Sequence, residues 1–288
     1  MEQSCREKHP AWVSRPEGTV YGIVLTHDLD SLLATAAYKK MYPNDPIIGF
    51  YDFKEEFRLC GDHSIEDIVY IDANMTRNKC WGNHPMLLQD DKGVPVVNRQ
   101  SVNLNNWFGN PTSRYDDKVH FSTTLHLLSY YGFDLKQLTD PDALGVLMMI
   151  DGVYNTFLGN NQKWIDKDTH YLENVLEYPE LVYFMDTHSS YSYFQKLDQR
   201  IGVFRDVQHD PVSNKVCTHI NTTELTKMFE PWGLDFSLPK GDWKRIATYN
   251  YDAQNFHKRH IPSQDNVHSC SWNSTKKMYV STLKTLHV

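Results

Sequence analysis

A strand that runs directly into a tight polar turn and a helix lies near the start of this chain and limits the folds open to it. The run YGIVLTHD (21–28) is apolar and rich in β-branched residues until its last positions, which predicts a buried strand whose C-terminal end reaches solvent. The next run, SLLATAAYKKMYP (31–43), is rich in good helix formers and stops at a proline. A strand, a turn and a helix in this order form the first half of a βαβ unit, which places parallel strands in one sheet.

The pattern repeats further along the chain. IIGFYDF (47–53), EDIVYIDANM (66–75) and the shorter PVVNRQSVNL (95–104) each predict another strand. Helical periodicity then dominates residues 120–204, and short strand candidates return from about residue 202 onwards. We therefore expect an α/β fold with a parallel-sheet N-terminal lobe, a helical middle segment and a smaller α/β C-terminal lobe, divided into residues 1–200 and 201–288.

Composition narrows the class of protein. Hydrophobic residues make up 40% and charged residues 23% of the chain, as in ordinary globular domains, and no run approaches the roughly 20 apolar residues that span a bilayer. The N-terminal residues have no apolar run behind a basic start, so we expect a cytoplasmic protein without a membrane partner. Five scattered cysteines without a Cys-x-x-Cys pair indicate reduced thiols.

Charge is unevenly distributed along the chain. The net charge is −7, which argues against a general binder of duplex DNA. From residue 240 to the end, eight lysines and arginines stand against three aspartates, a balance of +5, which leaves −12 for the rest. This division suits a protein that holds cations in one lobe and phosphates with the other, with Lys258 and Arg259 as candidate substrate-binding residues. A basic tail that simply faces solvent explains the same pattern equally well.

Acidic residues follow two of the predicted strands. His27, Asp28 and Asp30 lie where the first strand meets the first helix, and Asp72 ends the run IVYID. Ligands collect at the carboxyl ends of parallel strands, so these side chains are expected to converge. Mixed carboxylate and imidazole ligands suit manganese or magnesium better than thiophilic metals. Taken singly, Asp28 or Asp30 could equally serve as a helix cap.

Two further candidate ligands lie downstream. His84 belongs to the turn WGNHPM, and Asp151 follows the apolar run GVLMMI. Each alone is more typical of a loop residue or a helix cap than of a metal ligand. In the sequence, these two residues come after His-Asp-x-Asp at the end of one predicted strand and Asp72 at the end of another. The whole set favours a shared metal site.

These motifs resemble those of the DHH phosphoesterases, a superfamily of exonucleases, oligoribonucleases, cyclic-dinucleotide phosphodiesterases and family II pyrophosphatases. IVLTHDLDSLLATA (23–36) is similar to their first motif, Asp72 to the second and Asp151 to the fourth. Asn83-His84-Pro85 would stand at the Asp-His-His triplet, where two of three residues differ. An alternative alignment puts Asp72-Ala73-Asn74 at the triplet. The resemblance covers roughly residues 20 to 160, and the last third carries no glycine-rich substrate motif of that family.

The resemblance implies a phosphodiesterase that hydrolyses single-stranded nucleic acid or short oligonucleotides with a water activated by two Mn²⁺ or Mg²⁺ ions about 4 Å apart. The implied ligands are His27, Asp28, Asp30, Asp72, His84 and Asp151, with Asp28, Asp30, Asp72 and His84 as catalytic residues. The altered triplet leaves a second hypothesis open, an inactive relative that binds a nucleotide or a protein partner. Hydrolysis of pyrophosphate is less favoured, because no basic substrate motif of that subgroup is found.

Overall fold

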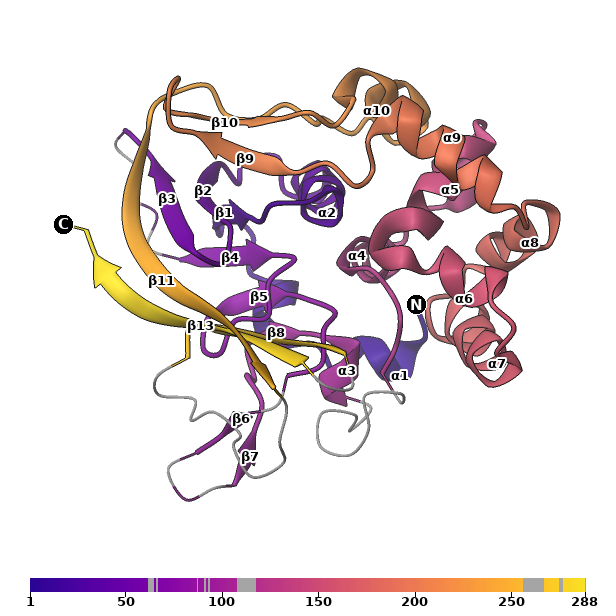
Figure 1. The fold of residues 1–288 in the computed structure, drawn as a ribbon, viewed down its shortest axis with the longest axis horizontal. Coiled ribbons are helices and arrows are strands. Elements are labelled where there is room, and N and C mark those ends of the chain that lie inside the picture. Colours follow the sequence, from indigo (N-terminus) through magenta and orange to yellow (C-terminus); the bar gives the residue numbers. More distant parts are fainter. Residues whose placement is uncertain are drawn as a thin grey trace.

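A mixed sheet forms the centre of the molecule (Figure 1). The computed structural model describes residues 1–61, 65, 67–86, 88–90, 92, 94–107, 118–255, 267–274 and 277–287. Among these residues nine strands hydrogen-bond in the order β12-β13-β11-β3-β2-β1-β4-β5-β8. In chain order they are β1 (Gly22–Leu25), β2 (Ile47–Tyr51), β3 (Glu55–Leu59), β4 (Ile68–Ile71), β5 (Lys79–Trp81), β8 (Ser101–Val102), β11 (Trp243–Asn255), β12 (Ser269–Ser274) and β13 (Lys277–Leu286).

Half of this sheet is parallel and half is antiparallel. β2, β1, β4, β5 and β8 run parallel to one another, whereas β3, β11, β13 and β12 each pair antiparallel. The predicted α/β class is confirmed, but the sheet is less parallel than the sequence pattern indicated, because β3 and the C-terminal strands extend it on one side. Two short hairpins complete the strands, β6 (Leu88–Gln89) with β7 (Pro95–Val96) and β9 (Val207–Asp210) with β10 (Lys215–Thr218).

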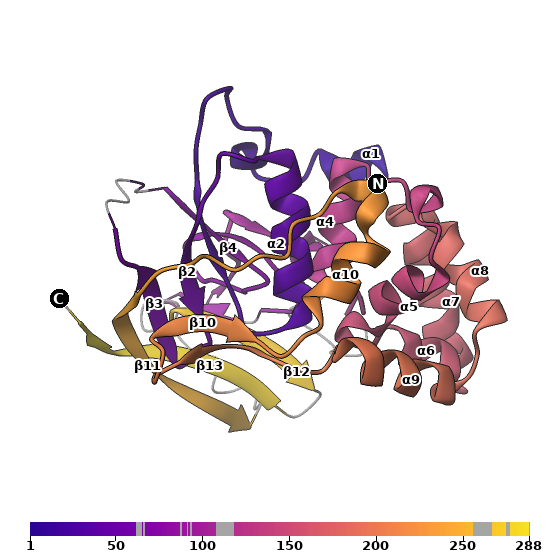
Figure 2. The same cartoon turned by 90° about the horizontal axis from the view of Figure 1, so that it is seen from above.

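Helices cover one face of the sheet and form a group beside it (Figure 2). α2 and α4 lie side by side next to the strands, and α5 to α9 form the group. The helices are α1 (Gln3–Arg6), α2 (Leu29–Met41), α3 (Leu104–Trp107), α4 (Thr123–Tyr131), α5 (Pro141–Met149), α6 (Tyr154–Leu158), α7 (Gln162–His170), α8 (Pro179–Thr187), α9 (Tyr191–Ile201) and α10 (Thr222–Met228).

Helix α2 illustrates how the local sequence determines the fold. The Asp28 side chain caps α2 by accepting a hydrogen bond from the Ser31 amide at 3.1 Å, a common use of aspartate at a helix start. Residues 29–38 are all buried, because the helix is enclosed between the sheet and α4. The Ser31 hydroxyl donates to the carbonyl of Ile71 at 3.1 Å, which ties the start of α2 to the end of β4.

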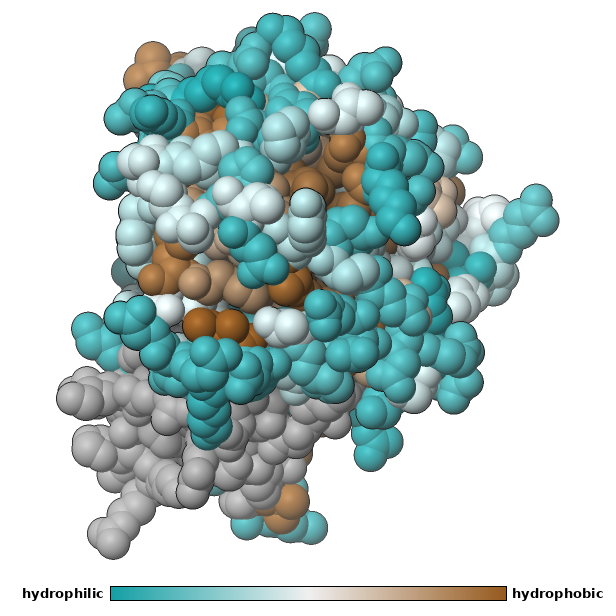
Figure 3. All heavy atoms as spheres, turned by 90° about the vertical axis from the view of Figure 1, so that its right-hand side faces the viewer, coloured by the Kyte–Doolittle hydropathy of each residue, from teal (hydrophilic) through white to brown (hydrophobic). Residues whose placement is uncertain are grey.

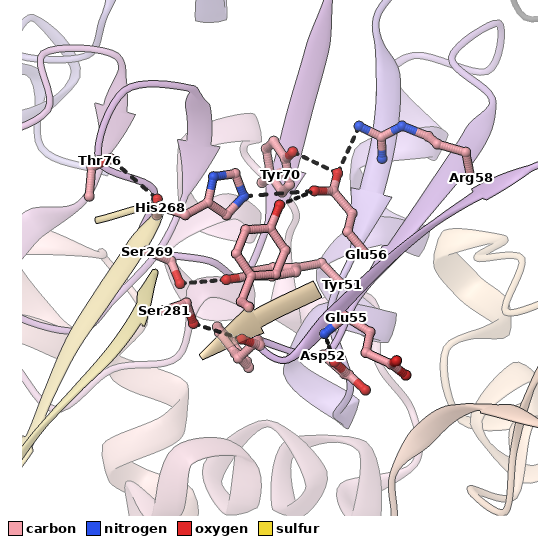
Figure 4. Close-up of polar contacts among 12 residues, drawn as sticks. Tyr51, Asp52, Glu55, Glu56, Arg58, Tyr70, Thr76, His268, Ser269 and Ser281 are labelled. Atoms are coloured by element: carbon pink, nitrogen blue, oxygen red, sulfur yellow. Dashed lines mark hydrogen bonds and ion pairs between the residues drawn. The ribbon is translucent and has the colours of Figure 1, made fainter. Parts of the chain in front are cut away.

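The C-terminal strands are joined to the parallel strands by a buried polar network (Figure 4). The Glu56 carboxylate is 3% exposed and accepts hydrogen bonds from the hydroxyls of Tyr70 at 2.8 Å and Tyr249 at 2.7 Å. It also pairs with Arg58 at 2.8 Å and lies 3.7 Å from Nε2 of His268. Strands from both sides of residue 200 therefore share one sheet, and the division into lobes at that residue stays a prediction.

The side of the molecule that carries the helical group shows many polar side chains, with apolar side chains exposed between them in several patches (Figure 3). Long apolar helices are absent from the described part of the chain: none could cross a membrane. The helices instead bury their apolar residues in the central cluster that includes Leu33, Leu128 and Leu147.

Candidate active site

Neighbouring strands bring the predicted carboxylates to one edge of the sheet. β1 and β4 pair in parallel with Leu25 opposite Ile71, so Asp28 and Asp72 follow adjacent strand ends. β4 also pairs with β5, which ends just before Asn83. The carboxyl ends of parallel strands are where α/β sheets bind ligands.

Asp30 is held from the start of α4. Its side chain is buried, and its two oxygens accept the backbone amides of Thr123 and Thr124, each at 2.7 Å. Amides at a helix start have no partner within the helix, so a carboxylate placed there is stabilised. Asp30 thus links α2 to α4, a structural role that the sequence pattern did not reveal.

Asp72 and Asp151 both adopt left-handed backbone conformations, with φ of 59° and 54°. Such values are uncommon outside glycine, are best tolerated by asparagine and aspartate, and gather at functional sites. The Asp72 carboxylate accepts the hydroxyls of Thr123 at 2.8 Å and Thr26 at 3.3 Å, whereas that of Asp151 accepts the side-chain amide of Asn83. Each carboxylate is therefore aimed by a tight turn and fixed by polar neighbours.

The four carboxyl groups meet in pairs. Asp28 lies within hydrogen-bond reach of Asp72, and Asp30 of Asp151. Burial, followed by the charges of neighbouring aspartates, holds the pKa of Asp30 and of Asp72 well above the usual range. The same causes raise the pKa of Asp151 to about 7, although by accessible surface this residue is exposed where it lines the pocket.

These donors have the chemistry of a site for a hard divalent cation. Carboxylate oxygens suit Mn²⁺ or Mg²⁺, and Nδ1 of His27, at the rim of the same cluster, is buried without a hydrogen-bond partner. Within the described ranges no three His, Cys, Asp or Glu side chains are already grouped to hold one ion. The donor types therefore suit a hard divalent cation, and the role of these residues as its ligands stays a prediction.

His84 lines a different pocket from Asp28 and Asp30, and Asp151 is common to the two pockets. No hydrogen bond or ion pair joins the His84 ring to a described carboxylate. Burial, with a smaller contribution from Lys118, lowers the pKa of His84 to about 3, so its imidazole is neutral and able to bind a metal. Its role as a ligand stays a prediction.

A pocket of about 300 Å³ opens over the carboxylates and brings in residues that sequence reasoning missed. Phe204 and Arg205, from the segment between α9 and β9, line this pocket together with Asp28 and Asp30. The Phe204 side chain is 63% exposed, and Arg205 is exposed as well. An aromatic ring next to an arginine in a turn was the available signal, but its distance along the chain from Asp28 concealed the connection.

Buried asparagines support the turn that carries Asn83 and His84. Asn103 donates to Oδ1 of Asn74 at 2.9 Å and to the carbonyl of His84 at 2.8 Å. Oδ1 of Asn105 accepts the amide of Val119 at 2.7 Å. The run SVNLNN contains two of these asparagines, so clustered asparagines after a short strand were the signal for this support.

The predicted substrate-binding residues Lys258 and Arg259 lie outside the described residues, so their role stays a prediction. Comparison with models of known protein families, with curated proteins and with solved structures found no match to this chain. The resemblance to DHH phosphoesterases therefore rests on the motifs of the sequence.

The raised pKa values predict how metal binding depends on pH. Asp151 keeps its proton up to about pH 7 in the folded, metal-free protein, whereas the unfolded chain releases it near its ordinary pKa of 3.8. The stability of the metal-free protein should therefore fall as pH rises from about 4 to about 7. A cation must displace these protons, so its affinity should rise about tenfold per pH unit below 7 for each proton released.

Thermal unfolding with and without Mn²⁺, at several pH values on either side of 7, measures both effects. We expect the melting temperature of the metal-free protein to fall with pH and the stabilisation by Mn²⁺ to grow. A stabilisation by Mn²⁺ of the same size throughout the series would show that protons and cations do not compete for these carboxyls.

Proposed function

We propose that this chain is a phosphodiesterase that depends on divalent cations and acts on single-stranded nucleic acid or short oligonucleotides. The observation that carries the proposal is that Asp28, Asp30 and Asp151 line one pocket beside the carboxyl ends of two adjacent parallel strands, with Asp72 within hydrogen-bond reach of Asp28. Crowded carboxylates repel one another when ionised, and a divalent cation relieves that repulsion. Phosphoryl transfer needs chiefly positioning and charge neutralisation, so a nucleophilic serine or cysteine is not required.

The four aspartates would hold manganese or magnesium, which when bound would supply an activated water and neutralise charge on the phosphoryl oxygens. The protein's own residues would do the positioning. Thr26 and Thr123 fix the carboxylate of Asp72, and Asn83 fixes that of Asp151. Arg205 lies at the rim of the carboxylate pocket, where its guanidinium would attract a phosphate.

A second candidate function is binding of a nucleotide without cleavage. Its support is the altered third motif, together with the lack of a preformed three-donor group among the described residues. In this case the carboxylates would still bind a cation, but no turnover would follow.

An assay of hydrolysis separates the two functions. The protein is treated with a chelator, then supplied with Mn²⁺ or Mg²⁺ and given end-labelled RNA and DNA oligonucleotides of a few residues, with bis-p-nitrophenyl phosphate as a generic diester. We expect cleavage only when a cation is added. Binding of the oligonucleotides without hydrolysis of any diester, at neutral and mildly alkaline pH, would favour the inactive alternative.

A further inference from the structure

A second pocket adjoins the carboxylate cluster at Asp151. It is lined by Asn83, His84, Lys118, His120, Asp151 and Trp164 among others, and its volume is about 180 Å³. Pockets that enclose whole drug-sized ligands measure about 300–1,000 Å³, so this one suits a part of a substrate, such as a single ring system. Asp151 also lines the carboxylate pocket, so a substrate held at the carboxylates can extend into the second pocket.

A hydrogen bond from a histidine to a buried carboxyl group fixes the orientation of one wall. Nδ1 of His120 lies 3.2 Å from both oxygens of Asp168, whose side chain is fully buried. An ionised carboxylate only accepts hydrogen bonds, so Nδ1 donates and Nε2 is left for another partner. Nε2 makes no hydrogen bond within the described part of the chain. Burying a carboxylate is costly and gives little net stability, which favours a functional reason for holding this ring.

An aromatic side chain forms the adjacent wall. Trp164 and Asp168 are four residues apart on α7, so both project from the same face of the helix towards His120. The ring centroids of Trp164 and His120 are 5.6 Å apart and the rings are inclined at 54°. Trp164 is only partly buried, and it lines the pocket. An indole with accessible surface is a sequence-tolerant platform for stacking a nucleobase.

A positive charge, that of Lys118, also lines this pocket. Lys118 is near enough to lower the pKa of both Asp151 and His84 through its charge. A lysine in this position favours an anionic group beside Asp151. The pocket therefore combines an aromatic wall, an oriented imidazole and a cationic side chain beside Asp151.

We propose that this second pocket binds the nucleoside part of a nucleotide whose phosphate lies next to Asp151. The base stacks on Trp164, Nε2 of His120 hydrogen-bonds the base or the ribose, and Lys118 neutralises the phosphate. The position of the phosphate rests on the proposed function, whereas the stacking site stands on the pocket itself.

Binding of adenosine 5′-monophosphate tests the pocket, with ribose 5-phosphate as the probe that lacks a base. Calorimetry is performed on chelator-treated protein and again with Mg²⁺. Loss of a stacked base costs about 1–3 kcal/mol, so Trp164→Leu should weaken binding of the nucleotide about 5- to 150-fold and leave ribose 5-phosphate unchanged. Tyr183→Leu is the matched control, because this tyrosine is 72% exposed on α8 and does not line the pocket.

A second variant keeps the test valid if Trp164→Leu fails to fold. Thr156→Phe fills the same pocket while leaving Trp164 in place, and it should weaken binding of the nucleotide to a similar degree. Equal nucleotide affinities in the wild type, Trp164→Leu and Thr156→Phe would overturn the proposal. Hydrolysis of bis-p-nitrophenyl phosphate tests the proposed function separately from the nucleoside pocket. If the diester is cleaved but Trp164→Leu does not change nucleotide affinity, the nucleoside pocket is refuted and the phosphodiesterase stands. If nucleotide affinity depends on Trp164 but no diester is cleaved, the phosphodiesterase is refuted and the pocket stands.

Discussion

Replacing Asp72 by asparagine is expected to lower cation-dependent phosphodiesterase activity by about 10³-fold. Asp72 lies in contact with Asp28 at the end of β4, where it would bind the cation. Charge stabilisation by a bound metal is worth several kcal/mol in the transition state, and each ~1.4 kcal/mol corresponds to a tenfold change in rate. The measurement is kcat/KM for a short oligonucleotide at saturating Mn²⁺.

The same variant should keep its fold. Asparagine tolerates the left-handed backbone at this position, where φ is 59°. The hydroxyl groups of Thr26 and Thr123 can rotate to suit an amide. Removing one of several crowded carboxyls also relieves repulsion at neutral pH.

Asp52→Asn provides the control for this experiment. Asp52 follows β2 at the same edge of the sheet, but its carboxylate accepts the amides of Lys54 and Glu55 instead of facing the cluster. The phosphodiesterase activity of the Asp52→Asn protein should match that of the wild type. Near-normal turnover by a folded Asp72→Asn protein would remove this residue from the catalytic site.

Replacing Glu56 by alanine is expected to destabilise the protein by about 3–5 kcal/mol. Removing the buried Glu56 leaves the partly buried Arg58 guanidinium without its counter-charge, and two buried tyrosine hydroxyls also lose their acceptor. Glu56→Gln keeps an acceptor oxygen and should cost less. Urea unfolding measures the change in free energy.

The neighbouring residue gives a matched control. Glu55 precedes Glu56 on β3 and also pairs with an arginine, but Glu55 and its partner Arg245 are 31% and 50% exposed in their side chains. Exposed pairs contribute little, so Glu55→Ala should change stability by less than about 1 kcal/mol. Equal losses in the two alanine variants would show that the network in Figure 4 does not anchor the C-terminal strands.

Local patterns predicted the part of the fold that surrounds the carboxylates. The runs that became β1, α2, β2 and β4 have the apolar content or helix-forming residues of those elements, and the turns after β1 and β4 carry the acidic residues. β3 and β5 were missed because EEFRL is polar and charged in most positions and KCW has only three residues. Neither gives a clear pattern of alternation.

Contacts between distant segments could not be predicted in this way. His120 and Asp168 are 48 residues apart, and Glu56 and Tyr249 are 193 apart. Each residue alone is typical of an ordinary loop, helix or strand position. These residues form polar pairs only where the segment before α4 meets α7 and where β3 pairs with β11, so the sequence alone does not reveal them.

Calorimetric titration of Mn²⁺ into the chelator-treated protein at about pH 8, where Asp151 has lost its proton, tests the central claim most directly. The wild type should show saturable binding of about two ions per chain, with release of protons, and Asp72→Asn should show markedly weaker binding or fewer ions. Absence of saturable binding by the wild type, or identical titrations of the two proteins, would contradict the assignment of these aspartates to a divalent-cation site.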